Sequence, residues 1–165
     1  MASPAIPNYR KSVVDLLMPF AKADPRIVLL VGDMGFGAIE RFNTEFPGRM
    51  YNSGIAEQGM VGIAAGMALG GLKPIVYHMP NFLAFRAIEQ VRNDVVLQDL
   101  PVKFIATGVD DYFKFLGKSH CCGTQDAEIM KMVGMRVHDP YRDGVPFEQM
   151  VSEWIADDKP AYIRV

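Results

Sequence analysis

Cysteine is scarce in this sequence: there are only two, the adjacent Cys121 and Cys122. Neighbouring cysteines cannot build a disulfide framework, and they lack the repeated spacing of a structural zinc site. A reducing compartment, the cytoplasm, is therefore the expected setting. Small buried residues are the expected role of both cysteines.

Long apolar runs and clustered charge are also missing. Residues 1–10 contain two prolines and no apolar leader, and no later run reaches membrane-spanning length. The formal net charge is only −2 at pH 7, and Lys and Arg are scattered along the chain. No basic footprint for nucleic acid or an anionic membrane is present. We expect a soluble protein with a small-molecule substrate that binds neither nucleic acid nor membrane.

Apolar residues are abundant, and they form strand-like runs that alternate with segments of helical spacing. Half of the 165 residues are apolar, enough for the core of one domain. Residues 27–31 form a wholly apolar, β-branched-rich run before Gly32, typical of a strand buried on both faces of a sheet. Further strands are predicted at 74–77, 102–106, 135–138 and 161–165, and helices at 13–20, 60–68, 83–95, 126–133 and 147–155.

The order of these elements predicts the fold. Strands alternate with helices, so the fold class is α/β: a three-layer sandwich with a mainly parallel sheet. Residues 1–165 show no linker, repeat or low-complexity tract, and a single domain is expected. Residues 108–123 have no periodic pattern of apolar residues. They are predicted to be a loop at the carboxyl end of a strand, where functional residues are common.

Glu57 is the first residue with a candidate chemical role. It lies in residues 52–60 at the predicted entrance of a helix, just after a strand and a glycine turn. Taken alone, an acid at this position is most simply explained by its interaction with the helix dipole.

The sequence around Glu57 is more specific than the single acid. Residues 54–58 read Gly-Ile-Ala-Glu-Gln and continue with Met-Val-Gly at 60–62 and Ala-Ala-Gly-Met-Ala at 64–68. This run resembles the signature of the pyrimidine-binding domain of transketolases and 1-deoxyxylulose-5-phosphate synthases. Further features occur in the family's order: Asp33 after the first strand, residues 46–49 before Glu57, residues 81–85 after it, and residues 161–164 as the last strand. The resemblance covers the chain from about Asp33 to Val165.

The resemblance implies the thiamine-diphosphate-binding fold and thiamine diphosphate as cofactor. In the family the glutamate that matches Glu57 bonds N1′ of the cofactor's aminopyrimidine and stabilises its imino tautomer. A carboxyl group against aromatic rings in a dry crevice is expected to be pushed toward its neutral form, so that it can share a proton with the ring nitrogen.

Other residues take roles from the same resemblance. Phe82 and Phe85 match the aromatic wall on which the aminopyrimidine stacks, with Phe82 the stronger candidate, although a generic pair at this spacing is core. Asp33 is assigned to cofactor binding. His120 matches a catalytic histidine that donates to an oxyanion or relays a proton. The simpler alternative for His120 is an exposed loop histidine.

The loop before His120 departs from the family. Transketolases carry a second histidine where this chain has Gly108, and a substrate-reading aspartate where it has Leu116. Residues 110–115 are therefore the predicted source of this protein's own substrate preference. His78 and His138 fall at strand ends, where a structural role is expected.

The family's diphosphate-binding motif, Gly-Asp-Gly followed by paired asparagines, is absent from this chain. No metal site is therefore predicted here, and Mg²⁺ or a similar divalent ion and the diphosphate are expected on a partner. That partner is a diphosphate-binding, N-terminal transketolase-like subunit in a heterotetramer. The family's C-terminal domain is also absent, which indicates either a split-gene subunit or an excised domain.

Three functions are compatible with this pattern. The first is ketol transfer, in which a two-carbon unit passes from a ketose to an aldehyde. The second is a two-chain 2-oxo acid decarboxylase or carboligase. The third is a non-catalytic regulatory partner, which the intact Glu57 disfavours. Release of carbon dioxide from a 2-oxo acid separates the second function from the first.

Overall fold

The computed structural model describes residues 8–165. Six strands form one sheet in the order β2-β1-β3-β4-β6-β5, and every neighbouring pair is parallel. The strands are β1 (Ile27–Val31), β2 (Met50–Asn52), β3 (Lys73–His78), β4 (Lys103–Ala106), β5 (Arg136–His138) and β6 (Ala161–Arg164). The predicted α/β fold with a parallel sheet is confirmed.

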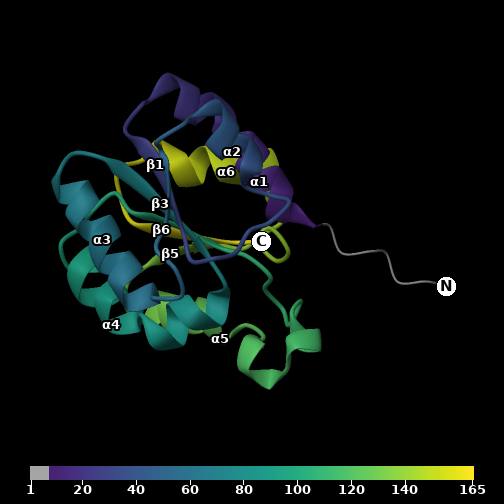
Figure 1. Ribbon diagram of the computed structural model, residues 1–165. Coiled ribbons are helices and arrows are strands. Elements are labelled where there is room, and N and C mark those ends of the chain that lie inside the picture. The colour runs from purple at the N-terminus through teal and green to yellow at the C-terminus, as the bar shows by residue number, and fades with distance from the viewer. Residues whose placement is uncertain (1–7) are drawn as a thin grey trace.

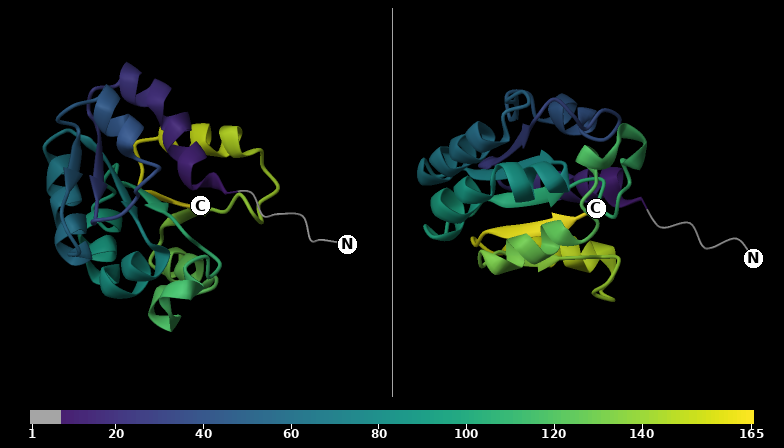
Figure 2. Two further views of the ribbon diagram at one scale, coloured as in Figure 1. Left: turned by 45° about the vertical axis from the view of Figure 1, so that its right-hand side comes forward. Right: turned by 90° about the horizontal axis from the view of Figure 1, so that it is seen from below.

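Helices cover both faces of the sheet and make it the middle of three layers (Figure 1). One face carries α1 (Tyr9–Ala23), α2 (Glu40–Glu45) and α6 (Phe147–Ala156), and the other carries α3 (Glu57–Leu69), η1 (Phe82–Arg86), α4 (Ile88–Gln90), η2 (Val91–Val96) and α5 (Gln125–Met132). The two views in Figure 2 show the same separation.

Alternation along the central strands fills both cores. In β1, Val28 and Leu30 join the cluster with Met60 under α3, whereas Leu29 joins the cluster with Trp154 under α6. All five residues of β1 are buried, as predicted for a strand covered on both faces.

Three local features differ from the predictions. Helix α2 is absent from the predicted elements because it is short and buries only Phe42. The helix predicted at 83–95 is divided into η1, α4 and η2. In η1 the Ala87 N–H bonds the Phe82 carbonyl, five residues back, at 3.2 Å, so the turn holds one extra residue. The predicted loop 108–123 contains two 3₁₀ turns, η3 (Lys114–Leu116) and η4 (Lys118–His120), and projects from the body of the domain (Figure 1).

The sheet has a topological switch between β1 and β3. The chain passes from β1 to β2 on one side, and then crosses to β3 on the other side of β1. In open parallel sheets such a switch leaves a crevice at the carboxyl ends of the two strands, where ligands bind. Gly32 follows β1 there, and a Cβ atom at this position would lie 2.3 Å from His78 Nε2. Only glycine allows this close approach.

Within residues 8–165, no helix combines the length and apolar character needed to cross a membrane.

Candidate active site

Glu57 is the first residue of α3, and its side chain has no exposed surface. Arg86 Nη1 donates to both carboxylate oxygens, at 2.7 Å to Oε1 and 2.6 Å to Oε2. His78 Nε2 lies 3.3 Å from Oε1. The glutamate therefore lies between a cation from η1 and a ring from the end of β3, at the carboxyl edge of the sheet.

The charge state of Glu57 differs from the expected one. Burial raises the pKa of the Glu57 carboxyl, but the Arg86 hydrogen bond, a backbone hydrogen bond and the charges of His78 and Arg86 lower it. The net effect is a pKa below the usual range. The expected shift toward the neutral form is thus wrong for this structure, because the sequence did not indicate a guanidinium at the carboxylate.

His78 is a site residue that sequence reasoning placed in a structural role. Its Nδ1 accepts the Met79 N–H at 2.8 Å, so only one ring nitrogen is used in holding the backbone. Burial lowers the pKa of His78 to about 4, which leaves the ring neutral with its proton on Nε2, toward Glu57. The available signal was its place at the end of a strand beside the switch.

The two predicted aromatic residues lie differently. Phe82 is half-buried, and the Arg86 guanidinium carbon lies 4.3 Å from its ring centroid. The ring edges of His78 and His120 approach Phe82 at centroid distances of 5.8 and 5.4 Å. Phe85 is 51% exposed and makes no ring contact within residues 8–165. Phe82 is therefore part of the Glu57 cluster, whereas Phe85 faces solvent.

His120 reaches the cluster through the loop that follows β4. It lies in η4, and Asn81 Nδ2 donates to the Ser119 carbonyl, which ties the loop to the start of η1. The Ser119 hydroxyl lies 3.0 Å from His120 Nδ1. These contacts bring His120 against Phe82, although the two are far apart in the sequence.

Asp33 shapes the approach to Glu57 and does not contact it. Its side chain is exposed and its backbone has a positive φ of 52°. The Asp33 N–H and the Gly54 N–H both donate to Asn52 Oδ1, each at 2.9 Å. Asn52, which sequence reasoning did not single out, thus joins the end of β1 to the turn before α3.

A buried ionic cluster anchors the loop 108–123. Arg164, at the end of β6, has no exposed side-chain surface and bonds Asp126, Asp139, Asp110 and the Gly123 carbonyl. Asp111 Oδ1 accepts the Gly123 N–H at 2.9 Å. Two of the residues predicted to set substrate preference, Asp110 and Asp111, therefore hold the loop in place. Phe115 and Leu116 in the same loop are exposed.

The cysteines beyond His120 differ in burial. Cys122 is buried, and this burial raises the pKa of its thiol to about 12. A thiol in that state is a poor nucleophile at neutral pH. The expected burial of Cys122 is confirmed. Cys121 is only partly buried, so the expectation that both cysteines are buried is wrong for this residue. Its thiol pKa is raised as well, with partial burial as the largest cause.

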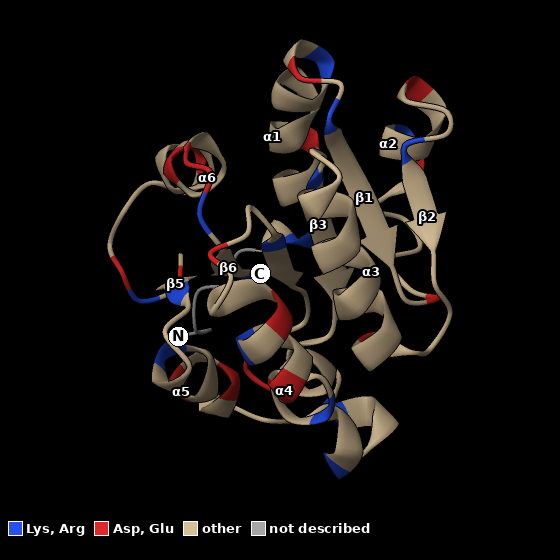
Figure 3. Cartoon of the chain, turned by 90° about the vertical axis from the view of Figure 1, so that its left-hand side faces the viewer, with Lys and Arg blue, Asp and Glu red and all other residues tan. Residues whose placement is uncertain are grey.

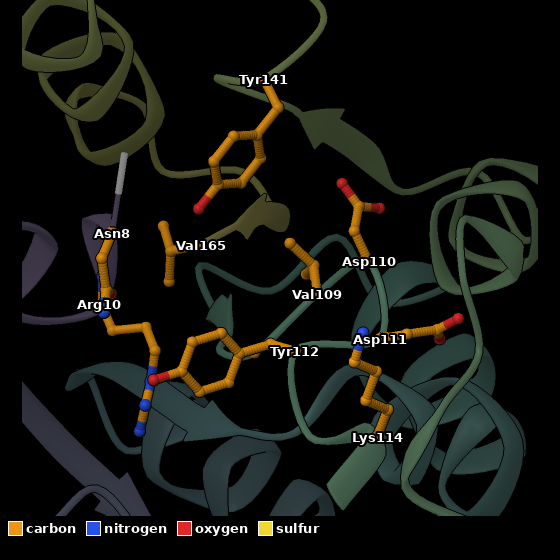
Figure 4. Close-up of a pocket in the computed structure, with 10 residues that line it drawn as sticks. Asn8, Arg10, Val109, Asp110, Asp111, Tyr112, Lys114, Tyr141 and Val165 are labelled. Carbon is orange, nitrogen blue, oxygen red and sulfur yellow. The ribbon is translucent and has the colours of Figure 1, made fainter. Parts of the chain in front are cut away.

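Two cavities within residues 8–165 are lined by residues other than Glu57, Phe82 and His120. One, of about 240 Å³, is lined by Arg10, Asp110, Tyr112, Tyr141 and their neighbours (Figure 4). Figure 4 shows the Arg10 side chain beside the Tyr112 ring. The other, of about 340 Å³, lies between the ends of β1 and β2 and helix α2. The space against Glu57 and Phe82 is filled by Arg86.

Acidic and basic residues are interspersed over the outer helices (Figure 3).

The structure thus places a buried glutamate and a half-buried aromatic ring at the switch point of a parallel α/β domain. The family model "Transketolase, pyrimidine binding domain" matches residues 6–165, and the chain belongs to this family.

Similar proteins include a transketolase subunit and a 1-deoxy-D-xylulose-5-phosphate synthase. The 6-deoxy-6-sulfo-D-fructose transketolase subunit SqwH of Clostridium sp. (strain MSTE9) is 34% identical over 158 residues, covering 94% of this chain and 48% of the relative. The 1-deoxy-D-xylulose-5-phosphate synthase of Mycobacteroides abscessus is 38% identical, covering 96% of this chain and 24% of the relative. The chain thus spans half or less of the length of these relatives.

Solved structures show the same fold. A structure described as a split gene transketolase, inactive β4 tetramer, is 31% identical, with a TM-score of 0.79 over 94% of this chain and 50% of that one. The transketolase of Leishmania mexicana shares the fold, with a TM-score of 0.75 over 97% of this chain and 26% of that one, at 18% identity.

Proposed function

We propose that this chain is the pyrimidine-binding subunit of a two-component, thiamine-diphosphate-dependent enzyme that transfers a ketol unit from a ketose to an aldehyde. One observation carries the proposal: a fully buried carboxylate lies at the switch point of a parallel sheet, beside a half-buried aromatic ring. The family match and the relatives support the same class of chemistry.

The residues at the site suit a flat nitrogen heterocycle. A guanidinium, which is itself planar and rich in N–H groups, already fits between the Glu57 oxygens and the Phe82 ring. His78 Nε2 lies 3.3 Å from Glu57 Oε1 but makes no well-formed hydrogen bond within residues 8–165, so a polar N–H lies beside the carboxylate. An aminopyrimidine matches both the stacking surface and the polar edge.

Each residue has a separate role in this proposal. Thiamine diphosphate, when bound, supplies the carbanion chemistry. Glu57 shares a proton at the ring nitrogen, and Phe82 orients the ring by stacking. His120, against the Phe82 edge, is placed to donate to or relay a proton from substrate. Phe85 and Asp33 stay predicted cofactor contacts, with Phe85 facing a partner and Asp33 shaping the turn before Glu57.

The diphosphate and its divalent ion, Mg²⁺ or a similar ion, are proposed to be held by a partner. Exposed apolar side chains surround the Glu57 cluster, notably Ile55, Ile63 and Phe85, and a partner surface would cover them. The description of one solved relative as an inactive tetramer of β subunits agrees with a subunit that is inert alone.

We propose a heterotetramer with two diphosphate-binding subunits, with residues 1–165 contributing a single domain. The cytoplasmic setting stays a prediction.

Glu57→Gln tests this function in the complex reconstituted with the diphosphate-binding subunit. Because glutamine cannot share a proton, ketol transfer should fall by about 10²–10⁴-fold. Glu148→Gln is the matched control, since Glu148 is an exposed first-turn acid of α6. The assay uses a panel of ketose phosphates and 6-deoxy-6-sulfo-D-fructose as donors, with carbon dioxide release from 2-oxo acids measured in parallel.

Three other results would contradict the proposed function. Unchanged activity in Glu57→Gln would remove Glu57 from the mechanism. Carbon dioxide release without ketol exchange would establish the decarboxylase alternative. A complex that binds no thiamine diphosphate would leave the regulatory role.

A further inference from the structure

The Arg86 side chain makes two contacts that define a small binding surface. Its Nη1 donates to both oxygens of Glu57, and its guanidinium carbon lies 4.3 Å from the Phe82 ring centroid. A planar group is thus held by a carboxylate at its edge and by an aromatic ring on its face.

The proposed cofactor pyrimidine needs the same two contacts. It would offer a ring nitrogen to Glu57 and a flat face to Phe82. Two groups cannot occupy one space, so the guanidinium and the aminopyrimidine exclude each other at this position.

The Arg86 side chain is free to move into solvent, whereas the Glu57 side chain is held in the core. The Arg86 side chain is 44% exposed, and the Glu57 side chain has no exposed surface. Within residues 8–165, Glu57 and Phe82 are the only groups to which Arg86 is bonded or stacked. A half-exposed arginine on a flexible stem can rotate into solvent without disturbing the core.

We propose that Arg86 occupies the place of the aminopyrimidine in the free subunit and leaves it when the cofactor is seated. This inference rests on the proposed function, because it needs thiamine diphosphate as the ligand. It makes Arg86 a positioning residue, which acts through Glu57.

Departure of Arg86 also changes the proton affinity of Glu57. The charged and titratable groups that face this carboxylate are Arg86 and His78. While Arg86 is bound, the pKa of Glu57 stays below its usual range. Without Arg86, burial is opposed only by a backbone hydrogen bond and by His78, so the pKa of Glu57 rises. Seating the cofactor thereby converts Glu57 into a group that can share a proton.

The first experiment uses the free subunit. Carbon-13 NMR of the Glu57 carboxyl during a pH titration should show a higher pKa in Arg86→Met than in the unaltered chain. Methionine keeps an unbranched side chain against Phe82 but has no N–H donors. Arg92→Met is the matched control, because Arg92 is exposed in η2 and its side chain bonds only Asn93 within the described residues. An unchanged Glu57 pKa in Arg86→Met would overturn the inference.

The second experiment measures the dissociation constant of thiamine diphosphate by isothermal titration calorimetry on the reconstituted complex. If the site is open about one-tenth of the time, Arg86→Met should bind roughly tenfold more tightly, because apparent affinity scales with the open fraction. Equal or weaker binding by Arg86→Met would overturn the inference and leave the proposed function intact. Absence of binding by both proteins would overturn both.

Discussion

Two carboxylates of this domain have the same degree of burial and different arginine partners. Glu57 and Asp126 both lie in the first turn of a helix, and neither side chain is exposed. The arginine on Asp126 is Arg164, which is itself fully buried, whereas Arg86 on Glu57 is 44% exposed. Asp126 also accepts from Tyr162, which adds a further buried bond.

The difference separates a structural ion pair from one that can open. Arg164 connects β6, the start of α5 and the loop 108–123, so its departure would leave several buried carboxylates without a partner. Arg86 covers a single carboxylate from the solvent side. Burial of the acid alone does not distinguish the two cases; the exposure of the cation does.

The largest expected effect on stability comes from the structural pair. Arg164→Met should lower the free energy of unfolding by about 3–5 kcal/mol, because buried acids lose their partner. Urea denaturation followed by circular dichroism measures this change. Arg86→Met is the comparison and should cost less, because Arg86 pairs with one carboxylate and Arg164 pairs with three. Equal losses in the two variants would show that both pairs are structural.

The second largest expected effect is on the pH dependence of the unfolding free energy, and it comes from His78, the neighbour of Glu57. The folded-state pKa of His78 is about 4, below the ordinary value of 6.5. Between these values the unfolded chain binds a proton that the folded chain does not, so stability falls as the pH is lowered from 6.5 to 4. The loss attributable to His78 is on the order of 3 kcal/mol.

His78→Asn should remove this part of the pH dependence, because asparagine has no titratable group and can still accept the Met79 N–H. Unfolding free energies at pH 7 and pH 4.5 measure the difference. A variant that retains the full pH dependence would show that another group is responsible.

The smallest expected effect lies at the exposed edge of the structural cluster. Arg142 is 46% exposed and pairs with Asp110 and Asp139, both of which Arg164 also binds. Arg142→Gln should therefore change the unfolding free energy by less than about 1 kcal/mol. A loss near that of Arg164→Met would mean that the cluster depends on its exposed member.

The sequence allowed the sheet and the position of Glu57 to be predicted, because both depend on local patterns. Runs such as residues 27–31 are apolar on both faces, and the residues around Glu57 carry a contiguous motif. Strand β2 and helix α2 lack such a signal, since β2 has no fully buried residue and α2 buries only Phe42.

The partners of Glu57 could not be predicted in the same way. Arg86 reaches the carboxylate through the wide turn η1, and residue spacing for a regular helix does not reveal that extra residue. His78 becomes a neighbour of Glu57 through the order of β1 and β3 and the bare backbone of Gly32. Asp110 and Asp111 were predicted to contribute to substrate preference because the loop around them departs from the family. Their contacts are instead bonds to Arg164 and Gly123.

The anchoring of the loop 108–123 separates the two halves of the site. Glu57 depends on β2 and α3, while His120 is carried by a segment fastened to the end of β6 through Arg164 and Asp110. Substitutions at exposed positions such as Phe115 and Leu116 change neither the elements that hold Glu57 nor the Arg164–Asp110 contact. The surface beside His120 can therefore change through substitutions in one projecting segment, while the Glu57 carboxylate and the elements that hold it stay unaltered.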